Sequence, residues 1–520
     1  MSLVEGRRLS WLRLSIVLVV TAGLVFVGMR GWQWFADSRV EVSEQQWFAG
    51  YVDVTATPTY PFENPVKGTG DSAVLGFVVA DPDEDCRPSW GAAYTLDEAQ
   101  EQLDLDRRVA RLTQLGGAPV ISFGGQANSE LALACDSVED LTAAYSRVVE
   151  RYDTEVVDLD VEGDALADTA SRTRRAEALA ALQDQHDTEV WLTLPVAPHG
   201  LPDDALAVVE ETLAAGVDLA GVNVMTMNYA ESRDPGQTMA RASISALEAT
   251  HEQLGRLYAD RGDRRTDAEL WRLVGATPML GQNDVVGEVF GLDDAEQLHR
   301  FAEDKGLGRM SVWSLNRDRS CSSNWPDVTK VSDSCSGLPQ ESGAFARLLG
   351  TGVEAGPRTA ATSDAPTDAT PTTSAVETDD PDTSPYPVWN TEQAYQSGER
   401  VVWHRNVYVA RYWTSGDVPD DPTVADADSP WRLVGPVLPG ETPEPLPTVA
   451  PGTFPDWRPG ATYTAGDRVQ LGDVAYVAQW WTRGTSPDAP STRDTPNPWR
   501  RLGAEELEQD VPDPTGTPTG

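Results

Sequence analysis

The sequence predicts an α/β protein: a (β/α)8 TIM barrel, preceded by an apolar N-terminal segment and followed by two small all-β modules. Three observations lead to this prediction. Strand-like and helix-like patterns alternate through the first two thirds of the chain, one strand carries three acidic residues, and an aromatic pattern recurs near the C-terminus. At 520 residues the chain is too long for one compact core, so several domains are expected.

Changes in composition mark the expected domain boundaries. Stretches rich in Thr, Ala, Pro, Asp and Ser bury too little apolar surface to offset their ordering entropy, so they are expected to be linkers or tails. The predicted segments are a cytoplasmic stub and signal anchor (1–39), the barrel (40–352), a linker (353–385), a first module (386–435), a second linker (436–453), a second module (454–503) and a disordered tail (504–520).

An apolar run, Leu14–Met29, lies between N-terminal arginines and Arg30. At ~1.5 Å per residue it spans ~24 Å, slightly less than a ~30 Å hydrocarbon core, but flanking arginines can snorkel and nearby aromatics can sit at the interface. The positive N-terminal flank places the rest of the chain outside the cell. We expect an uncleaved transmembrane helix, with a cleaved signal peptide as the alternative. The protein is extracellular in either case.

The net charge of −42 excludes nucleic acid and anionic membrane surfaces as partners, because both would repel the chain. A neutral or partly cationic substrate fits, although acidity that merely keeps a secreted protein soluble explains the charge equally well. Membrane contact is expected only through the N-terminal helix, and the protein is expected to be a monomer.

The four cysteines suit an oxidising compartment. Of the three possible pairings we favour Cys86–Cys135 and Cys321–Cys335, since each pair would join loops that the barrel order brings together. Zinc is the competing interpretation, but the sequence has no CxxC or CxxH pair and its five histidines are scattered. No metal and no cofactor are expected.

Eight strand candidates alternate with amphipathic segments, which favours a closed barrel over the alternative of an open α/β sheet. The strand candidates are Trp47–Val54, Val74–Ala80, Pro119–Gly124, Val156–Glu162, Val190–Val196, Val222–Tyr229, Leu273–Leu280 and Met310–Leu315. The amphipathic segments are Leu96–Leu115, Val138–Tyr152, Thr169–Asp184, Asp204–Ala215, Met239–Arg261 and Asp293–Lys305.

The fourth strand candidate carries carboxyls at every second position: Asp158, Asp160 and Glu162. Side chains alternate between faces along a strand, so these three share one face, which a barrel turns inward. Three ionised groups so close together are prohibitively costly to bury, so at least one must hold a proton at neutral pH. An exposed edge strand or a metal site are the alternatives. Glu162 ends the strand, where barrel active sites open, and is the candidate proton donor.

This run resembles the DxxDxDxE signature of family 18 glycoside hydrolases. Further matches are Ser122-Phe-Gly124-Gly125, Met225-Thr-Met227-Asn228-Tyr229 and Trp313. Glu155 stands where the family has Asp, Val156 where Gly is usual, and Asn228 where many members have Asp.

The resemblance implies a chitinase that uses substrate-assisted retaining hydrolysis, an exception to the two-carboxylate scheme. Glu162 would protonate the glycosidic oxygen while the sugar's own acetamido oxygen attacks the anomeric carbon. Asp160 would hold the acetamido N–H, and Asp158 would share a proton with Asp160. The implied substrate contacts are Tyr229, Asn228, Met227, Trp313 and Gly125. For Gly125, as for Ser122 and Gly124, a structural role that lets the backbone pass close to the carboxylates is the favoured interpretation. For Trp313, ordinary barrel core is the alternative.

A set of aromatic residues recurs at an offset of 68 positions. The pairs include Trp389 and Trp457, Tyr395 and Tyr463, Tyr408 and Tyr476, Trp413 and Trp481, and Trp431 and Trp499. The spacing is similar to chitin-binding modules of carbohydrate-binding families 5 and 12. Their implied ligand contacts are Tyr412, Trp413, Trp480 and Trp481. Because neighbours on a strand face opposite ways, we expect Tyr412 and Trp480 to be exposed and their partners to pack inward. Alternatively, all of these rings are core.

The expected function is hydrolysis of chitin, a polymer of N-acetylglucosamine, by an extracellular enzyme. An endo-β-N-acetylglucosaminidase that acts on N-glycans and a non-catalytic chitin-binding lectin are the alternatives.

Overall fold

The computed structural model describes residues 46–353 except 67, 69–71 and 326, residues 379–503 except 426–427, 444–446 and 490–494, and residues 506–507. The described residues form two units. The first takes its residues from Met1–Leu96 and Gly116–Ser363, and the second from Asp97–Leu115 and Asp364–Gly520. The predicted N-terminal helix at Leu14–Met29 lies outside the described residues. No helix within the described ranges is sufficiently long and apolar to span a membrane.

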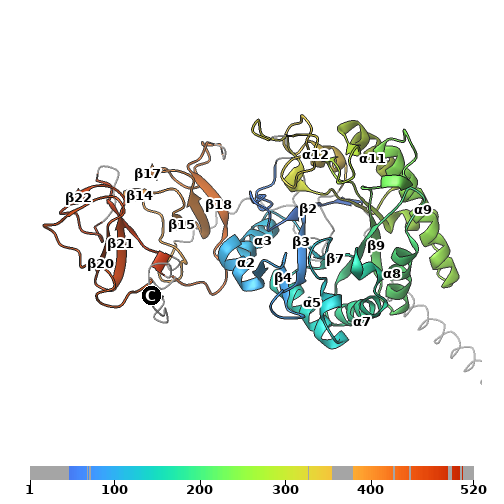
Figure 1. The fold of residues 1–520 in the computed structure, drawn as a ribbon, viewed down its shortest axis with the longest axis horizontal. Helices are drawn as coiled ribbons and strands as arrows, with labels where there is room; N and C mark the ends of the chain where they lie inside the picture. The colour runs from blue at the N-terminus through green and yellow to red at the C-terminus, as the bar shows by residue number, and fades with distance from the viewer. Residues whose placement is uncertain are drawn as a thin grey trace, which may run out of the picture. The chain divides into compact units, whose positions relative to one another are not determined.

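The first unit is built on a parallel sheet that closes into a ring (Figure 1). Its strands, in chain order, are β1 (Trp47–Phe48), β2 (Gly50–Asp53), β3 (Ala73–Ala80), β6 (Pro119–Gly124), β7 (Val156–Asp160), β8 (Glu189–Pro195), β9 (Leu219–Met225), β10 (Val274–Thr277) and β13 (Arg309–Met310). β1 pairs with β13 and β2 with β3, so the stretch Trp47–Asp53 closes the ring. This closure excludes the alternative of an open sheet.

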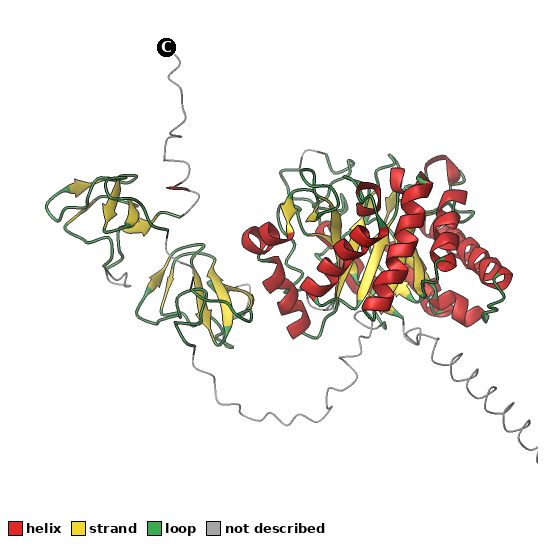
Figure 2. Cartoon of the chain, turned by 90° about the horizontal axis from the view of Figure 1, so that it is seen from below, coloured by secondary structure: helices red, strands yellow, loops and turns green. Residues whose placement is uncertain are grey.

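Helices surround the strands of this unit (Figure 2). They are α4 (Leu131–Ala134), α5 (Val138–Tyr152), α6 (Asp164–Ala167), α7 (Thr169–Gln185), α8 (Asp203–Ala214), α9 (Met239–Asp260), α10 (Asp267–Arg272), α11 (Leu292–Lys305) and α12 (Ala344–Leu349), with 3-10 turns η1 (Ala230–Ser232) and η2 (Leu315–Arg317). Local sequence sets several ends. Ser137 accepts the backbone N–H of Asp140 and starts α5, and Gly306, at φ 71°, ends α11.

Short antiparallel strands extend the loops of the ring. β4 (Pro88–Trp90) and β5 (Tyr94–Thr95) add to β3, and β11 (Gly281–Gln282) pairs with β12 (Val289–Phe290) in a hairpin after β10. Both favoured disulfides are present, Cys86–Cys135 and Cys321–Cys335.

Some predicted bounds differ from the structure. The segment Leu96–Leu115 is two helices, α2 (Leu96–Leu103) and α3 (Leu105–Gln114), because Asp104 between them adopts φ 52°. β7 ends at Asp160, so Glu162 lies just beyond the strand instead of ending it. β13 is also shorter than predicted, and Trp313 contributes only an isolated bridge to Met279.

The repeat of 68 residues in the sequence is also a repeat of structure. The first copy contains β14 (Ala394–Tyr395), β15 (Arg400–Trp403), β16 (Asn406–Ala410), β17 (Thr414–Ser415) and β18 (Trp431–Pro436), and the second β19 (Thr462–Tyr463), β20 (Arg468–Leu471), β21 (Val474–Ala478), β22 (Thr482–Arg483) and β23 (Trp499–Arg501). The pairings are the same in both copies. Each copy buries its own small core, with Trp431 in the first and Trp499 in the second.

Candidate functional site

A belt of polar side chains crosses the interior of the ring. It draws on seven of the strands and consists of Tyr51, Ser122, Asp158, Thr193, Asn223, Thr277 and Arg309. All seven are buried, so each polar group needs a partner within the belt. Asn223 illustrates this, since its Nδ2 donates to Thr193 Oγ1 (2.9 Å) and to Thr277 Oγ1 (2.8 Å).

Asp158 is the centre of the belt. Its Oδ2 accepts the hydroxyls of Tyr51 (2.8 Å) and Ser122 (2.7 Å). Its Oδ1 accepts hydrogen bonds from Oγ1 of Thr193 (2.6 Å) and from Nη1 of Arg309 (2.6 Å). Four donors, none of them Asp160, therefore occupy the oxygens of Asp158.

Asp160 lies two residues further along the same face of β7. Its side chain is buried, and Oδ1 has no hydrogen-bond partner among the described residues. Burial, together with the charges of Glu162 and Asp158, raises the pKa of Asp160 well above its usual value, although Arg309 partly opposes this. The predicted protonated carboxyl on this strand is thus Asp160 or its neighbour Glu162.

Glu162 is half-buried just past the carboxyl end of β7, on the side where the active sites of such barrels open. Burial and then the charge of Asp284 raise the pKa of Glu162 from 4.5 to about 7. A carboxyl with this pKa keeps a proton at neutral pH and can also release it, which is what a general acid needs.

Asn228 supports Asp284. Its Nδ2 donates to Asp284 Oδ2 (2.7 Å), and its Oδ1 accepts the backbone N–H groups of Asp284 (3.0 Å) and Val285 (3.3 Å). Both ends of the amide are therefore used within the loop between β11 and β12. The predicted contact of Asn228 with substrate is replaced by an indirect role, in which it holds Asp284 near Glu162.

Tyr229 does not face the carboxyls. Its ring is buried, and its hydroxyl pairs with Ser243 Oγ of α9 at 3.2 Å. The buried Glu288 accepts the backbone N–H of Tyr229 (2.9 Å) and so holds the chain in this turn. The substrate contact that the resemblance implies for Tyr229 is not seen here, and Tyr229 lies beyond β9, which ends at Met225.

Two glycines let the chain pass the end of β7. Gly124 and Gly125 adopt φ 98° and 83°, and the backbone N–H of Gly125 donates to the carbonyl of Asp160 at 2.9 Å. A Cβ on Gly124 would lie 2.2 Å from that carbonyl oxygen, and one on Gly125 would lie 2.9 Å from the ring of Phe77. Both glycines therefore allow a close backbone approach that a side chain would block.

Trp313 stacks on Phe77, with ring centroids 5.4 Å apart, and both rings are partly exposed. Tyr51 joins them at 6.0 Å from Trp313. These rings give an apolar surface inside the ring, above the polar belt. Met227 is likewise partly exposed just past β9.

All four predicted module aromatics are exposed: Tyr412 by 52%, Trp413 by 45%, Trp480 by 39% and Trp481 by 63%. The expectation that Trp413 and Trp481 pack inward is wrong. β16 ends at Ala410 and β21 at Ala478, so these pairs lie in bends, where strand alternation no longer applies.

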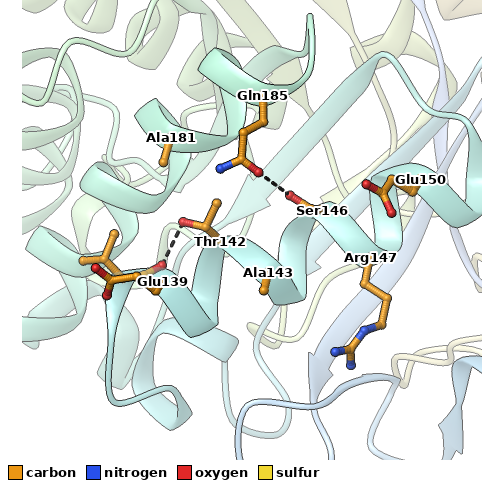
Figure 3. Close-up of a pocket in the computed structure, with 9 residues that line it drawn as sticks. Glu139, Thr142, Ala143, Ser146, Arg147, Glu150, Ala181 and Gln185 are labelled. Carbon is orange, nitrogen blue, oxygen red and sulfur yellow. Dashed lines mark hydrogen bonds between the residues drawn. The ribbon is translucent and has the colours of Figure 1, made fainter.

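A groove on the outer helices is separate from these residues (Figure 3). It lies between α5 and α7, where Ser146 donates to Gln185 at 3.5 Å, and none of the predicted site residues lines it. Within the described ranges, no group of three or more His, Cys, Asp and Glu side chains is arranged to hold a metal ion.

Comparisons with known proteins bear on both units. Residues 456–500 match carbohydrate-binding module family 5/12. The chain is 34% identical over 331 residues to a probable bifunctional chitinase/lysozyme of Escherichia coli, covering 60% of this chain and 35% of that one. It is 33% identical over 308 residues to Endochitinase 11 of Metarhizium anisopliae, covering 55% of this chain and 57% of that one.

Among solved structures, active domain 2 of a Pyrococcus furiosus chitinase is 27% identical, with a TM-score of 0.51, over 59% of this chain and 94% of that one. The first unit is a chitinase-like domain. The chain spans about a third of one curated relative and somewhat more than half of the other.

The most important residue that sequence reasoning missed in the chitinase-like domain is Arg309. It directly precedes the strand candidate Met310–Leu315, and a charged residue at the edge of a buried strand is the signal that could have found it. Asp284 carried no signal, because it lies in a loop and approaches Glu162 only through the fold.

We predict that Gly124→Ala destabilises the chitinase-like domain more than Gly116→Ala. Both positions have positive φ, 98° and 86°, so both variants should lose about 1 kcal/mol to backbone strain. Only Gly124 has a backbone atom in the way, since nothing lies within 4 Å of a Cβ on Gly116. The clash should bring the loss for Gly124→Ala to at least about 3 kcal/mol in chemical denaturation. Equal losses would contradict the proposed packing.

We also predict that Glu162→Gln changes how stability depends on pH. With its pKa raised from 4.5 to about 7, wild-type Glu162 holds a proton in the folded state that the unfolded chain releases across this range. The wild-type free energy of unfolding therefore falls as the pH rises from 4.5 to 7, whereas Gln does not titrate. Thermal unfolding of both proteins should show the variant gaining relative stability over this window. A pH-independent difference would rule out the raised pKa.

Proposed function

We propose that this chain is a chitinase, a glycoside hydrolase that cleaves β-1,4 linkages between N-acetylglucosamine units with a (β/α)8 barrel. Names of the relatives support the reaction class, since both curated proteins and the Pyrococcus furiosus structure are described as chitinases. The observation that carries the proposal is that Glu162, with its pKa raised to about 7, lies just beyond the buried Asp160 at the carboxyl end of β7.

In the proposed mechanism, Glu162 transfers its proton to the glycosidic oxygen as the bond to the anomeric carbon breaks. The acetamido oxygen of the same sugar attacks that carbon and forms an oxazolinium ion. Asp160 accepts the acetamido N–H and offsets the positive charge. Water then adds to the anomeric carbon and returns a proton to Glu162, so the product retains its configuration.

Apolar contact would hold the reacting sugar. Trp313, stacked on Phe77, offers a partly exposed ring face of the kind that packs against pyranose rings. Met227, at the end of β9, is proposed to line the same space. Neither Tyr229 nor Asn228 is assigned a substrate contact.

The two repeated copies are proposed to bind chitin. Residues 456–500 belong to a family of carbohydrate-binding modules, and residues 386–436 repeat the same strand pattern. Each copy exposes an adjacent pair of rings, Tyr412–Trp413 and Trp480–Trp481. Two tethered modules raise the effective concentration of the enzyme at an insoluble polymer even when each binds weakly.

We further propose that the protein acts outside the cytoplasm. Both cysteine pairs form disulfides, which persist in oxidising compartments. Chitin is insoluble and too large to enter a cell, so its hydrolysis requires export.

The first test is Glu162→Gln assayed on N-acetylglucosamine hexamer. We expect turnover to fall by about 10²–10⁴-fold with nearly unchanged binding, because the side chain keeps its shape but has no proton to transfer. Resolving the anomers of the wild-type product should give the β form first. Unchanged turnover in the variant would show that Glu162 is not the proton donor.

A high-mannose glycopeptide, assayed in parallel, tests the substrate class. Cleavage of the glycopeptide alone would instead assign an endo-β-N-acetylglucosaminidase. Cleavage of neither substrate would favour a lectin.

The second test is the double variant Trp480→Ala/Trp481→Ala. Removing two exposed rings should weaken binding to crystalline chitin by about tenfold or more and leave hydrolysis of soluble hexamer unchanged. The variant Tyr412→Ala/Trp413→Ala is the matched change in the first copy, and combining all four should weaken binding further. Equal losses on soluble and insoluble substrate would assign the modules another task.

A further inference from the structure

Two loops of the first unit carry most of its exposed apolar side chains. Among the described residues of this unit, the exposed large apolar side chains are Val66, Val286, Trp325, Val328 and Val331. Val286, which is 98% exposed, lies in the turn of the β11–β12 hairpin, and the last three lie in the loop between Cys321 and Cys335. Exposed apolar surface that gathers in one region marks a binding surface. We call Val286, Trp325, Val328 and Val331 the apolar rim.

A buried arginine, Arg317, joins the two loops. Its Nη1 donates to the carbonyl of Ser332 in the disulfide loop (2.8 Å), and its Nη2 donates to the carbonyls of Leu280 (2.8 Å) and Gln282 at the hairpin. The backbone N–H of Gln282 in turn donates to the carbonyl of Ser336, just after the disulfide, at 2.9 Å. Because the two loops share these hydrogen bonds, they form one joined structure.

The two loops also approach each other more closely than side chains would allow. Gly281 and Gly337 adopt φ 73° and 78°, a conformation that favours glycine. A Cβ on Gly281 would lie 1.9 Å from the carbonyl oxygen of Ser336, and one on Gly337 would lie 2.6 Å from Cγ of Gln282. The Cys321–Cys335 disulfide closes the second loop. The apolar rim is therefore held in place before a ligand binds, which lowers the ordering entropy that binding costs.

The apolar rim is continuous with the proposed sugar site. The backbone N–H of Leu280 donates to the carbonyl of Trp313 at 2.9 Å, so the hairpin begins beside the ring assigned to the reacting sugar. From Trp313 the chain passes through η2, which contains Arg317, into the disulfide loop. The hairpin also carries Asp284, whose charge acts on Glu162. Both loops therefore leave the barrel on the side where the proposed proton donor lies.

Trp325 supplies the large flat ring of the apolar rim. Its backbone N–H donates to the carbonyl of Ser322 (2.9 Å), and its Nε1 donates to the carbonyl of Asp327 (3.1 Å). The carboxyl of Asp327 accepts the hydroxyl of Thr329 at 2.6 Å. These hydrogen bonds hold the ring within the loop, while the residue stays 36% exposed. An aromatic ring held in this way can pack on the apolar face of a pyranose and loses little entropy on binding.

We propose that the apolar rim binds chitin units beyond the reacting sugar, with Trp325 as their ring contact. This inference rests on the proposed hydrolysis of chitin. A β-1,4-linked polymer repeats the same apolar ring face along its length, so a chain held at Trp313 can continue onto a second aromatic ring. The apolar rim then makes the enzyme favour long oligomers over short ones.

Charge favours a neutral polymer over a second copy of this chain as the occupant. The exposed charged side chains of the two loops are Asp284, Lys330 and Asp333, so the surroundings of the rim are slightly acidic. A second copy carries a net charge of −42 and would be repelled. Units of N-acetylglucosamine carry no charge and meet no such repulsion.

Calorimetric binding of N-acetylglucosamine oligomers tests the proposal. The full chain carries Glu162→Gln, so that ligand is not cleaved, and alanine at the four exposed module rings, so that the modules do not bind it. In this background Trp325→Ala should lower the affinity for hexamer about five- to tenfold and leave the affinity for trimer unchanged, because only the longer ligand reaches the rim. Trp325→Phe keeps a ring and should restore most of the affinity. Unchanged hexamer affinity in Trp325→Ala, or an equal loss for both ligands, would overturn the proposal.

A second variant decides the matter if Trp325→Ala folds poorly. Val286 is almost fully exposed, so the fold should tolerate Val286→Asp. A carboxylate that loses solvation against a sugar ring should lower the affinity for hexamer about threefold or more. Unchanged hexamer affinity in Val286→Asp would then refute the inference.

Leu115→Ala is the matched control. It also truncates an exposed apolar side chain, but Leu115 lies directly after α3 and outside both loops. The affinities for hexamer and trimer should therefore stay unchanged. A loss as large as that of Trp325→Ala would mean that truncating any exposed apolar side chain weakens binding, and the proposal would fail.

Hydrolysis separates this inference from the proposed function. Failure of the wild type to cleave hexamer would overturn the proposed function and leave the apolar rim to be judged from calorimetry alone. Cleavage of hexamer with the same kcat/KM in the wild type and Trp325→Ala would overturn only the rim. Sedimentation velocity covers the other occupant: self-association that Trp325→Ala abolishes, with unchanged hexamer affinity, would assign the rim to a second copy of the chain and overturn the proposal.

Discussion

The desolvation of the carboxyls on β7 is the constraint on which the organisation of this barrel depends. Two of them, Asp158 and Asp160, are buried on one face of the strand, where ionised groups lose most of their solvation. The structure offsets the cost of burial in a different way for each of these two carboxyls. Asp158 receives a cation and three hydroxyl donors, whereas Asp160 has none of these and has a raised pKa.

This asymmetry gives the two neighbouring carboxyls different hydrogen-bond surroundings. Asp158 is held by Arg309 and accepts the hydroxyls of Tyr51 and Thr193 around it. Asp160, next to the half-buried Glu162, instead keeps an oxygen with no hydrogen-bond partner among the described residues. The buried polar belt therefore sets different surroundings for the two carboxyls.

Loops beyond the strands then adjust the outermost acid. Asn228 uses both ends of its amide to hold the loop that carries Asp284, and Asp284 contributes to the pKa of about 7 at Glu162. In the modules too, the residues offered to ligand lie past the strands, since both exposed aromatic pairs follow the ends of β16 and β21. In both units the strands form the scaffold, and the exposed or half-exposed candidate residues lie in the segments directly after the strands.

The sequence by itself determined the alternating strands and helices, the shared face of Asp158 and Asp160 and the repeat of 68 residues, and it favoured the cysteine pairing that the structure contains. These are local patterns or fixed spacings, and a period of two along a strand suffices to assign a face. It did not determine the partners of those carboxyls. Arg309, Tyr51 and Asp284 are far from β7 along the chain and reach it only because the ring closes and the loops fold over its end. Alternation also misplaced Trp413 and Trp481, because each lies where the strand has already ended and tertiary packing, not periodicity, determines the direction of the side chain.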